Sequence, residues 1–116
     1  MTALSNPTTH HLAQLSLLAG QYQLLFSDIV LLEGQANYTL FYCHSRQPIL
    51  TSKSLSFYQD RLPTYLMRVH KSYFVNLHFV TDFNGETLSL SDGRCIPVSR
   101  RRRREVREYL QAQKFQ

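Results

Sequence analysis

Residues 66–77 read LMRVHKSYFVNL, and this stretch decides the fold. Its first four residues have the apolar character of a strand, and residues 70–73 form a polar break before Phe74 and Val75. We expect Tyr73, Phe74 and Val75 to lie in the core. Asn76 is expected to brace a turn, because asparagine side chains bond to nearby backbone groups. The stretch therefore predicts a strand-rich domain.

Two hairpin signals follow in the same part of the chain. The pair Asn84-Gly85 separates two strand-like segments, and Asp92-Gly93 separates the second of them from a third that ends at Val98. Asn-Gly and Asp-Gly favour the tight turns in which backbone φ is positive. We therefore predict a β-meander in the C-terminal part of the chain.

The segment before this stretch is also strand-like. Residues 22–32 predict a strand that is buried at its end, and residues 33–37 predict a turn. Residues 38–44 predict an aromatic-rich strand with two largely apolar faces. After a break at Pro48 the strand restarts, and residues 54–62 have the apolar spacing of a short helix.

The N-terminal segment has a different pattern. Residues 1–11 are polar and are expected to be frayed. Over residues 12–19 leucine and alanine recur at helical spacing, and Gly20 suits a helix stop, so we expect a short helix. This helix would pad the edge of the core or make a dimer contact. We therefore divide the chain into an N-terminal extension, residues 1–20, and one domain, residues 21–116.

A final helix is predicted from Ser99 to about residue 113, with Ser99 as its N-cap. It opens with five arginines, residues 100–104, which cannot share one face because each helical residue turns by about 100°. The ridge opposite the apolar stripe of the helix contains Arg100, Arg104 and Arg107.

Two further arginines of the run have other surroundings. Arg101 lies near Glu105 and Glu108, which can partly neutralise it, and the stem of Arg102 can pack beside the apolar stripe. Cations in the first turn oppose the helix dipole by roughly 0.3–1 kcal/mol each, and a docked phosphate would reverse this cost. The placement therefore favours nucleic-acid contact over a merely solvated charge run.

The charge distribution supports the same interpretation. The chain has 116 residues, 43% of them hydrophobic, which suits one domain with its own core. Residues 1–45 hold two acidic residues and no Lys or Arg. Residues 46–116 hold all 13 basic residues against six acidic ones, a net charge of +7. We therefore expect a surface for a polyanion in this second part.

Several other classes of function find no support. No apolar run approaches the roughly 20 residues of a membrane span, and no basic region precedes an apolar one at the N-terminus, so a cytoplasmic protein is expected. Cys43 and Cys95 lack CxxC spacing and are expected to be reduced, half-buried thiols. Histidines such as His10 and His11 lack zinc-ligand spacing, so neither a metal nor a cofactor is expected. Nucleophile-elbow, P-loop, HExxH and paired-acid motifs are absent, so we expect no enzyme.

Residues 66–77 closely resemble the signature of the LytTR DNA-binding family, an R-x-H-R-S-Y-x-V-N pattern led by phenylalanine or leucine. Three other segments agree with the family in order and spacing: residues 28–38, 53–63 and 88–101. The resemblance covers roughly residues 22–110.

The resemblance implies a mostly β fold, an elongated stack of small antiparallel sheets with short helices and a C-terminal basic helix. It also implies a bacterial transcription regulator that binds double-stranded DNA sequence-specifically. In such proteins loops, rather than a recognition helix, enter successive major grooves. Family members usually bind paired direct repeats and bend the DNA, so a homodimer on repeated sites is expected here.

The DNA-facing set follows from matching positions and from the arginine ridge. It comprises Asn37, Tyr38, Thr39, His70, Lys71, Ser72, Ser99, Arg100, Arg101 and Arg104. Arg100 or Arg101 suits a bidentate contact to guanine, and Lys71 suits a phosphate or guanine. Asn37 suits adenine or a phosphate oxygen. For His70 a structural hydrogen bond and a base contact are both open.

Two departures from the family pattern change the expectations. Lys71 stands where the family usually has arginine, so the charge is kept but the planar fork is lost. The run of five arginines is longer than the usual pair and predicts extra salt-dependent affinity without extra specificity.

The alternatives concern the source of the regulatory signal and the ligand that the basic surface binds. Larger family members carry a receiver domain before the DNA-binding part, and only about 20 residues precede the resemblance here. We therefore expect a free-standing regulator or one with a separate signal-sensing partner. The runner-up is an RNA-binding or protein-interaction module that uses the same basic surface. Residues 99–108 contain no aromatic residue to stack on bases, which favours duplex DNA.

Overall fold

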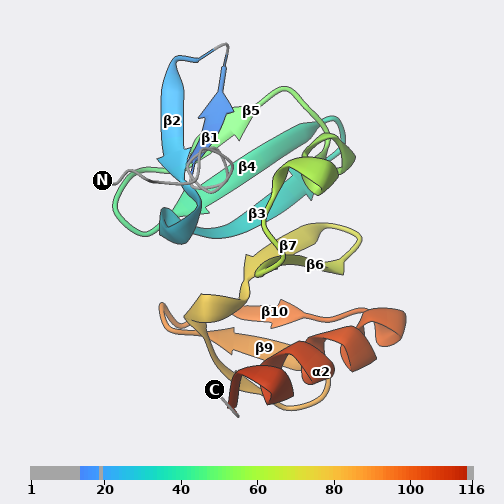
Figure 1. Cartoon of the computed structure of the whole chain (residues 1–116). Helices are drawn as coiled ribbons and strands as arrows, with labels where there is room; N and C mark the ends of the chain where they lie inside the picture. Colours follow the sequence, from blue (N-terminus) through green and yellow to red (C-terminus); the bar gives the residue numbers. More distant parts are fainter. Residues whose placement is uncertain (1–13, 19, 115–116) are drawn as a thin grey trace.

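The computed structural model describes residues 14–18 and 20–114. In these residues the strands form three antiparallel sheets, of two, five and three strands, which lie above one another (Figure 1). A basic helix ends the described chain. The predicted class, mostly β with small antiparallel sheets and a C-terminal helix, is confirmed.

The two-stranded sheet pairs β1 (Gln14–Leu17) with β2 (Tyr22–Leu25). The expectation of a helix over residues 12–19 is wrong for the strand residues, and Leu12 and Ala19 lie outside the described residues. Leu15 and Leu17 are buried while Gln14 and Ser16 are exposed, so period two prevails over the helical spacing. The hairpin thus joins both sides of the expected boundary between residues 20 and 21.

The five-stranded sheet has the order β5-β4-β3-β7-β6. Its strands are β3 (Ile29–Gln35), β4 (Tyr38–Cys43), β5 (Ile49–Thr51), β6 (Leu66–His70) and β7 (Tyr73–Asn76). In the central strand β3, Leu32 belongs to one buried apolar cluster and Leu31 to a second one. Because both faces are covered, four consecutive residues of β3 are buried.

The expected core of the deciding stretch is confirmed. Phe74 and Val75 are buried, and Tyr73 packs partly buried against the second cluster. Asn76 is fully buried; its Nδ2 donates to the carbonyl of Ile29 (2.8 Å), and its Oδ1 accepts from the backbone N–H of His78 (2.9 Å). Asn76 therefore braces the start of the next turn, as predicted.

Short 3-10 helices connect the strands: η1 (Phe26–Asp28), η2 (Leu55–Arg61) and η3 (Leu77–Phe79). The helix expected over residues 54–62 is η2, with Leu55 and Tyr58 buried. Gly34 lies directly beneath it. A Cβ on Gly34 would stand 3.1 Å from the Cβ of Leu55, so this glycine permits the close approach of η2 to β3.

The predicted C-terminal meander is confirmed. It consists of β8 (Val80–Phe83), β9 (Thr87–Leu90) and β10 (Cys95–Pro97) in the order β10-β9-β8. Gly85 and Gly93 have φ of +96° and +93°, which non-glycine residues rarely adopt. The two pairs Asn84-Gly85 and Asp92-Gly93 thus provide the turns.

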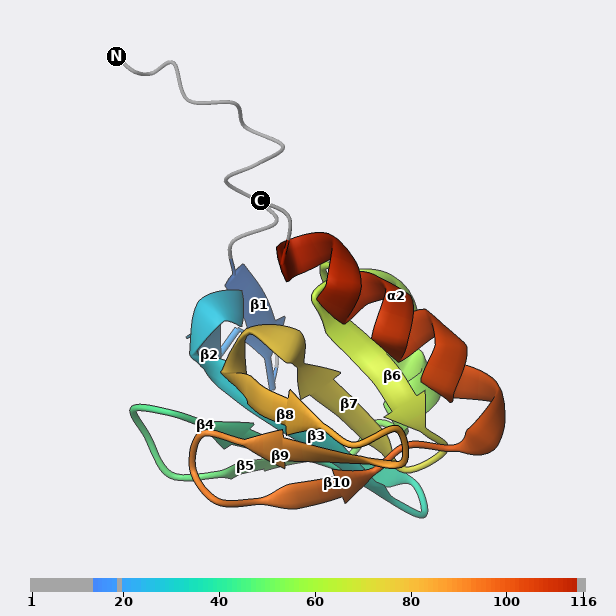
Figure 2. The ribbon, with the colours of Figure 1, turned by 90° about the horizontal axis from the view of Figure 1, so that it is seen from below.

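The last helix begins as η4 (Arg100–Arg102) and continues as α2 (Arg103–Lys114). Figure 2 shows α2 beside β6, and in Figure 1 it lies in front of the meander. Val106 is fully buried in the second cluster. Ser99 precedes the first turn, but the expected side-chain cap is not formed. The first turn is instead closed by the backbone, where the N–H of Arg102 donates to the carbonyl of Ser99 (2.9 Å).

Both cysteines are free thiols, in different strands. Cys43 is half-buried, as expected, and burial raises its pKa to about 11. Cys95 is exposed, which corrects the expectation that both are half-buried, because its side chain lies on the outer face of the edge strand β10. No helix in the described part of the chain is both long and apolar enough to cross a membrane.

Candidate nucleic-acid interface

Three turns from distant parts of the sequence lie at one end of the sheets. The backbone N–H of Gly34, before the β3–β4 turn, donates to the carbonyl of Ser72 in the β6–β7 turn (2.8 Å). The N–H of Ser99, before the last helix, donates to the carbonyl of Val69 in β6 (2.9 Å). The three segments follow the right-hand side of the molecule in Figures 1 and 2. Main-chain hydrogen bonds therefore fix their relative positions.

The β6–β7 turn presents Lys71. The pairing of β6 with β7 shifts register between Arg68 and His70, a bulge that re-aims the end of the strand. The Nδ1 atom of His70 accepts a hydrogen bond from the N–H of Ser72 (3.1 Å). The structural hydrogen bond expected as one alternative for His70 is thus present, and this bonding assigns its proton to Nε2 in the neutral ring. The side chain of Lys71 is exposed.

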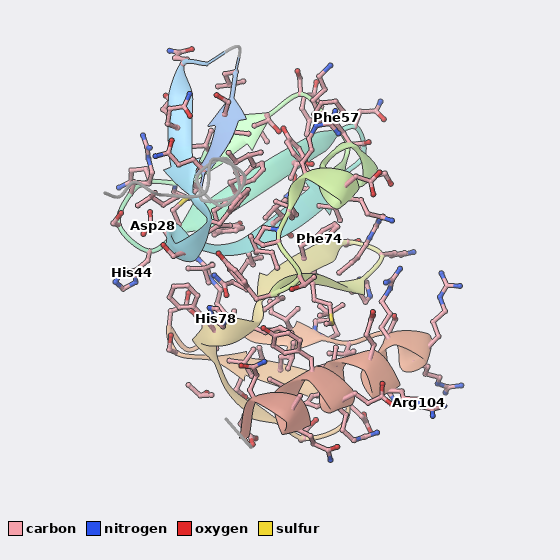
Figure 3. All side chains as sticks on the ribbon, in the orientation of Figure 1. Asp28, His44, Phe57, Phe74, His78 and Arg104 are labelled. Atoms are coloured by element: carbon pink, nitrogen blue, oxygen red, sulfur yellow. The ribbon has the colours of Figure 1, made fainter. Side chains whose placement is uncertain are left out.

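The start of the last helix presents a second set of cations. Arg100, Arg104 and Arg107 are exposed, in agreement with the predicted ridge, and Arg101 is exposed as well. Figure 3 shows Arg104 projecting away from the sheets. Arg104 Nε lies 3.2 Å from Glu108 Oε2, one turn along α2. This pair corrects the expectation that Glu108 neutralises Arg101; at full exposure such a pair contributes little stability.

The inner arginines of the run hold the backbone. Arg102 is half-buried, and its Nη1 donates to the carbonyl of Arg68 (3.3 Å). The Nε of Arg103 donates to the carbonyl of Val98 (3.2 Å). These hydrogen bonds fix the start of the helix against β6 and against the residue that follows β10. The five arginines therefore divide into exposed and anchoring ones.

Both basic stretches meet in one hollow of about 290 Å³. It is lined by Arg68, His70, Lys71, Ser99, Arg101 and Arg102, and none of these residues is acidic. The stretch around Lys71 and the start of the last helix therefore lie on one surface. Low-dielectric walls around charges of one sign concentrate their potential on an anion.

Arg68 belongs to this hollow and was absent from the residues chosen by sequence. Its Nη2 donates to the carbonyl of Lys71 (2.7 Å), and its Nη1 donates to Gln59 Oε1 in η2 (3.1 Å). Its guanidinium also stands over the ring of Phe74, 5.5 Å from the centroid. Burial and the nearby charge of Arg102 lower the pKa of Arg68. Its position in the R-x-H signature was the only signal in the sequence.

The β3–β4 turn presents a smaller polar surface. Asn37 is exposed, and Tyr38 exposes half of its side chain. Thr39, by contrast, is fully buried, and its hydroxyl donates to the carbonyl of Lys53 (2.8 Å). The inclusion of Thr39 in the DNA-facing set does not fit this position, because its only polar side-chain atom is occupied inside the protein. We therefore leave it out of the interface.

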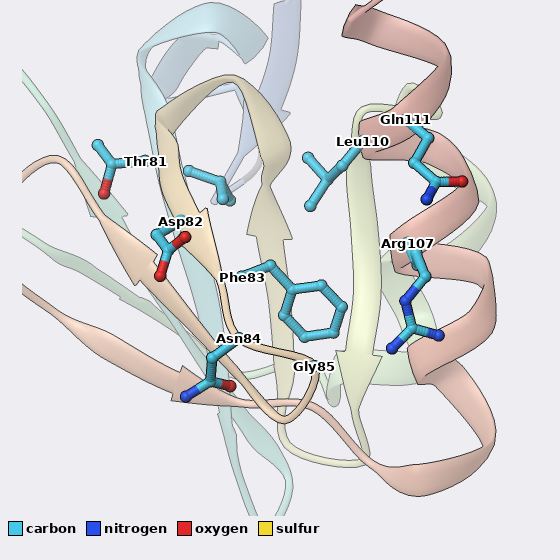
Figure 4. A pocket seen from close by; sticks show the side chains of 9 residues that line it. Thr81, Asp82, Phe83, Asn84, Gly85, Arg107, Leu110 and Gln111 are labelled. Atoms are coloured by element: carbon cyan, nitrogen blue, oxygen red, sulfur yellow. The ribbon is translucent and has the colours of Figure 1, made fainter.

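A second hollow, of about 460 Å³, lies between the β8–β9 hairpin and α2 (Figure 4). Apolar side chains such as Phe83 and Leu110 line it together with Arg107 and Asp82. Because both signs of charge line it, it has no preference for a polyanion. Among residues 14–18 and 20–114, no group of three His, Cys, Asp or Glu side chains is placed to hold a metal ion.

Comparison with known proteins identifies the family. Residues 19–111 match the family model described as the LytTr DNA-binding domain. Among solved structures, the chain is similar to the LytTr DNA-binding domain of a protein from Bacillus cereus described as a methyl-accepting/DNA response regulator. The two share 23% sequence identity and a TM-score of 0.68 over 84% of this chain and 96% of that one. No curated protein matches the chain. At 23% identity the structural likeness shows the fold alone. The family match over most of its length shows that this chain belongs to the LytTR family of DNA-binding domains.

Proposed function

We propose that this protein is a transcription regulator that binds double-stranded DNA sequence-specifically through the end of the sheets where the three turns meet. The observation that carries the proposal is the single hollow that joins Lys71 to the start of the last helix. Two basic stretches nearly thirty residues apart in the sequence act as one surface there. LytTR is a family of DNA-binding domains and not an enzyme family, which agrees with this role.

The charges of this surface are largely unneutralised. Among the described residues, carboxylates pair only with Arg94 and Arg104 within salt-bridge distance. The exposed Lys71, Arg100 and Arg101 are therefore available to phosphates, and Arg104 can exchange its weak, solvent-exposed pair with Glu108 for a phosphate. A duplex would release condensed counterions on binding, and affinity would fall steeply with salt.

We assign base reading to the exposed tips of the turns. Lys71 and Arg100 or Arg101 have the reach and the donors for guanine, and Asn37 has the paired donor and acceptor for adenine. The β6–β7 turn and the start of the last helix enter the major groove, and the β3–β4 turn contacts the backbone or the next groove. His70 and Ser72 shape the turn that presents Lys71, and Ser99 positions the arginines.

The assembly that we propose is a homodimer on paired repeats in the cytoplasm, with a separate partner that supplies the signal. The DNA-binding unit comprises residues 21–116. Residues 14–17 of the preceding extension are tied to this unit, because β1 pairs with β2 along its whole length.

One observation favours the runner-up, an RNA-binding module. Tyr38 is half exposed beside the basic end of the sheets, and an exposed aromatic ring can stack on an unpaired base. A single such ring provides one stacking position, whereas single-strand binders usually align several. Duplex DNA therefore remains the proposed ligand.

The test is a selection of bound sequences from random duplex pools, followed by binding measurements by fluorescence anisotropy on the selected duplex and on single strands. We expect the double substitution R100A/R101A to lower affinity for the selected duplex more than about tenfold. Because both side chains are exposed, the melting temperature should stay nearly unchanged.

The matched control removes two other positive charges. Arg46 follows β4 and Arg94 lies in the β9–β10 turn, both at the opposite end of the sheets. R46A/R94A should keep most of the affinity. Equal losses in both double variants, or tighter binding to single strands than to duplex, would overturn the proposal.

A further inference from the structure

Two buried donors without a partner belong to residues beside the hollow at Lys71. The Ser99 hydroxyl and the Arg68 Nε atom are inaccessible to solvent, and neither forms a hydrogen bond within the described part of the chain. Both residues line the hollow. A buried donor left unsatisfied is costly, and native proteins rarely keep one without a ligand or a functional reason.

The charges around these donors specify the kind of ligand. Arg68, Lys71, Arg101 and Arg102 line the same hollow, and no carboxylate lines it. Burial lowers the pKa of Arg68, and repulsion from the nearby charge of Arg102 lowers it further. Only backbone and neutral side-chain acceptors bind the two guanidinium groups. A compact oxyanion would relieve this repulsion and accept from several donors at once.

We infer that this hollow is a discrete oxyanion site that binds one tetrahedral phosphate group. The Ser99 hydroxyl donates one hydrogen bond to it, and the guanidinium groups and the Lys71 ammonium supply the charge. The phosphate comes either from the DNA backbone or from a small phosphate in solution. The inference deepens the proposed function in the first case and stands without it in the second.

Ser99 is held in place without capping the helix through its side chain. Its backbone N–H is held by Val69 and its carbonyl accepts from Arg102, so both main-chain groups are fixed. Its hydroxyl is buried beneath the surface of the residues that line the hollow, and it is unpaired rather than bonded to the first helical turn. The interior volume, about 290 Å³, is also sufficient for one phosphate group.

The first experiment uses inorganic phosphate and the full chain without DNA. Amide chemical shifts are followed by NMR during titration with phosphate, with chloride at the same ionic strength as the reference. We expect saturable shifts grouped at residues 70–72 and 99–102. S99A should weaken phosphate binding about tenfold without a change in net charge, because one hydrogen bond to a charged group is lost. R101A serves as a second variant, since its exposed side chain can be removed without risk to folding.

Arg104 provides the matched control, since it is exposed on the same helix but does not line the hollow. R104A should leave phosphate binding unchanged while it lowers DNA affinity. Three results would overturn the inference. They are shifts that match those in chloride, shifts that spread over the whole basic surface, and wild-type phosphate affinity in both S99A and R101A.

Competition then distinguishes the two sources of phosphate. If a backbone phosphate occupies the site, phosphate at constant ionic strength displaces a bound duplex more strongly than chloride does. If phosphate binds the free protein but does not compete, the site stands and takes a small phosphate from solution. A protein that binds phosphate but no duplex would disprove the proposed function and keep the oxyanion site.

Discussion

The Nη2 atom of Arg68 donates to the main-chain carbonyl of Lys71 at 2.7 Å, so a partly buried guanidinium fixes the turn that presents the lysine. A second nitrogen of the same guanidinium binds Gln59 in η2 at 3.1 Å. The guanidinium of Arg68 therefore lies beneath the turn and holds the backbone that carries the exposed ammonium of Lys71. A planar fork makes this possible, because its nitrogens donate in different directions at fixed angles.

Arg68→Lys keeps the charge but loses the fork. We expect it to lower duplex affinity about fivefold, since a single ammonium cannot hold Gln59 and the Lys71 carbonyl in the same geometry. A double-mutant cycle with Lys71→Ala shows whether Arg68 acts through the lysine. In that case R68K has little further effect once Lys71 is gone, whereas additive losses would assign Arg68 a separate contact.

Lys71→Ala separates base reading from phosphate binding. If Lys71 contacts a base edge, its loss should cost about 1–3 kcal/mol on the selected duplex and much less on an unrelated one. Affinities for both duplexes at one salt concentration check this. Equal losses on the two would leave Lys71 with a phosphate contact only.

Arg104→Ala should reduce the salt dependence of binding. A plot of log affinity against log salt concentration is expected to lose about 0.9 from its slope, because one phosphate contact disappears. Arg46→Ala, which removes the same charge at the other end of the sheets, should leave the slope unchanged. The prediction fails if the two variants change the slope alike.

Asn76→Ala should destabilise the domain by about 2 kcal/mol. It leaves the carbonyl of Ile29 and the N–H of His78 without their buried partner. Urea unfolding of the variant measures the loss. Asn37→Ala, at an exposed position, should stay within about 0.5 kcal/mol of the wild type. A comparable loss at Asn37 would contradict the special role of Asn76.

The two thiols should differ in reactivity. Cys95 is exposed, whereas Cys43 is half-buried with its pKa raised to about 11. Because the thiolate is the reactive form, Cys43 stays protonated and slow at pH 8 and gains reactivity only as the pH approaches 11. Modification with a thiol reagent, followed by mass spectrometry, should label Cys95 first. C95S should remove the fast phase, and C43S should keep it.

Local chemistry in the sequence predicted much of the fold. Asn84-Gly85 and Asp92-Gly93 formed the expected turns because positive φ is a property of the turn residues themselves. The same approach predicted a helix over residues 12–19, where residues 14–17 form a strand. Leucines at helical spacing there also alternate with polar residues, and pairing with β2, a contact outside the segment, selects the strand.

The candidate site was predictable to a similar extent. The exposed positions of Lys71, Arg100 and Arg101 followed from the signature and from helical angles. The burial of Thr39 did not, because its hydroxyl binds the carbonyl of Lys53, fourteen residues away, and only the folded sheet brings the two together. Arg68 was missed for the same reason: its partners come from η2 and the next turn.

The central strand β3 has a mechanical consequence. Leu31 and Leu32, adjacent in the chain, belong to the two separate apolar clusters, so neither cluster can come apart without exposing the same backbone. A force that separates the upper and lower sheets therefore has to unfold the entire domain. If the duplex has to curve to reach all three turns, the DNA supplies the deformation and the protein stays a rigid template.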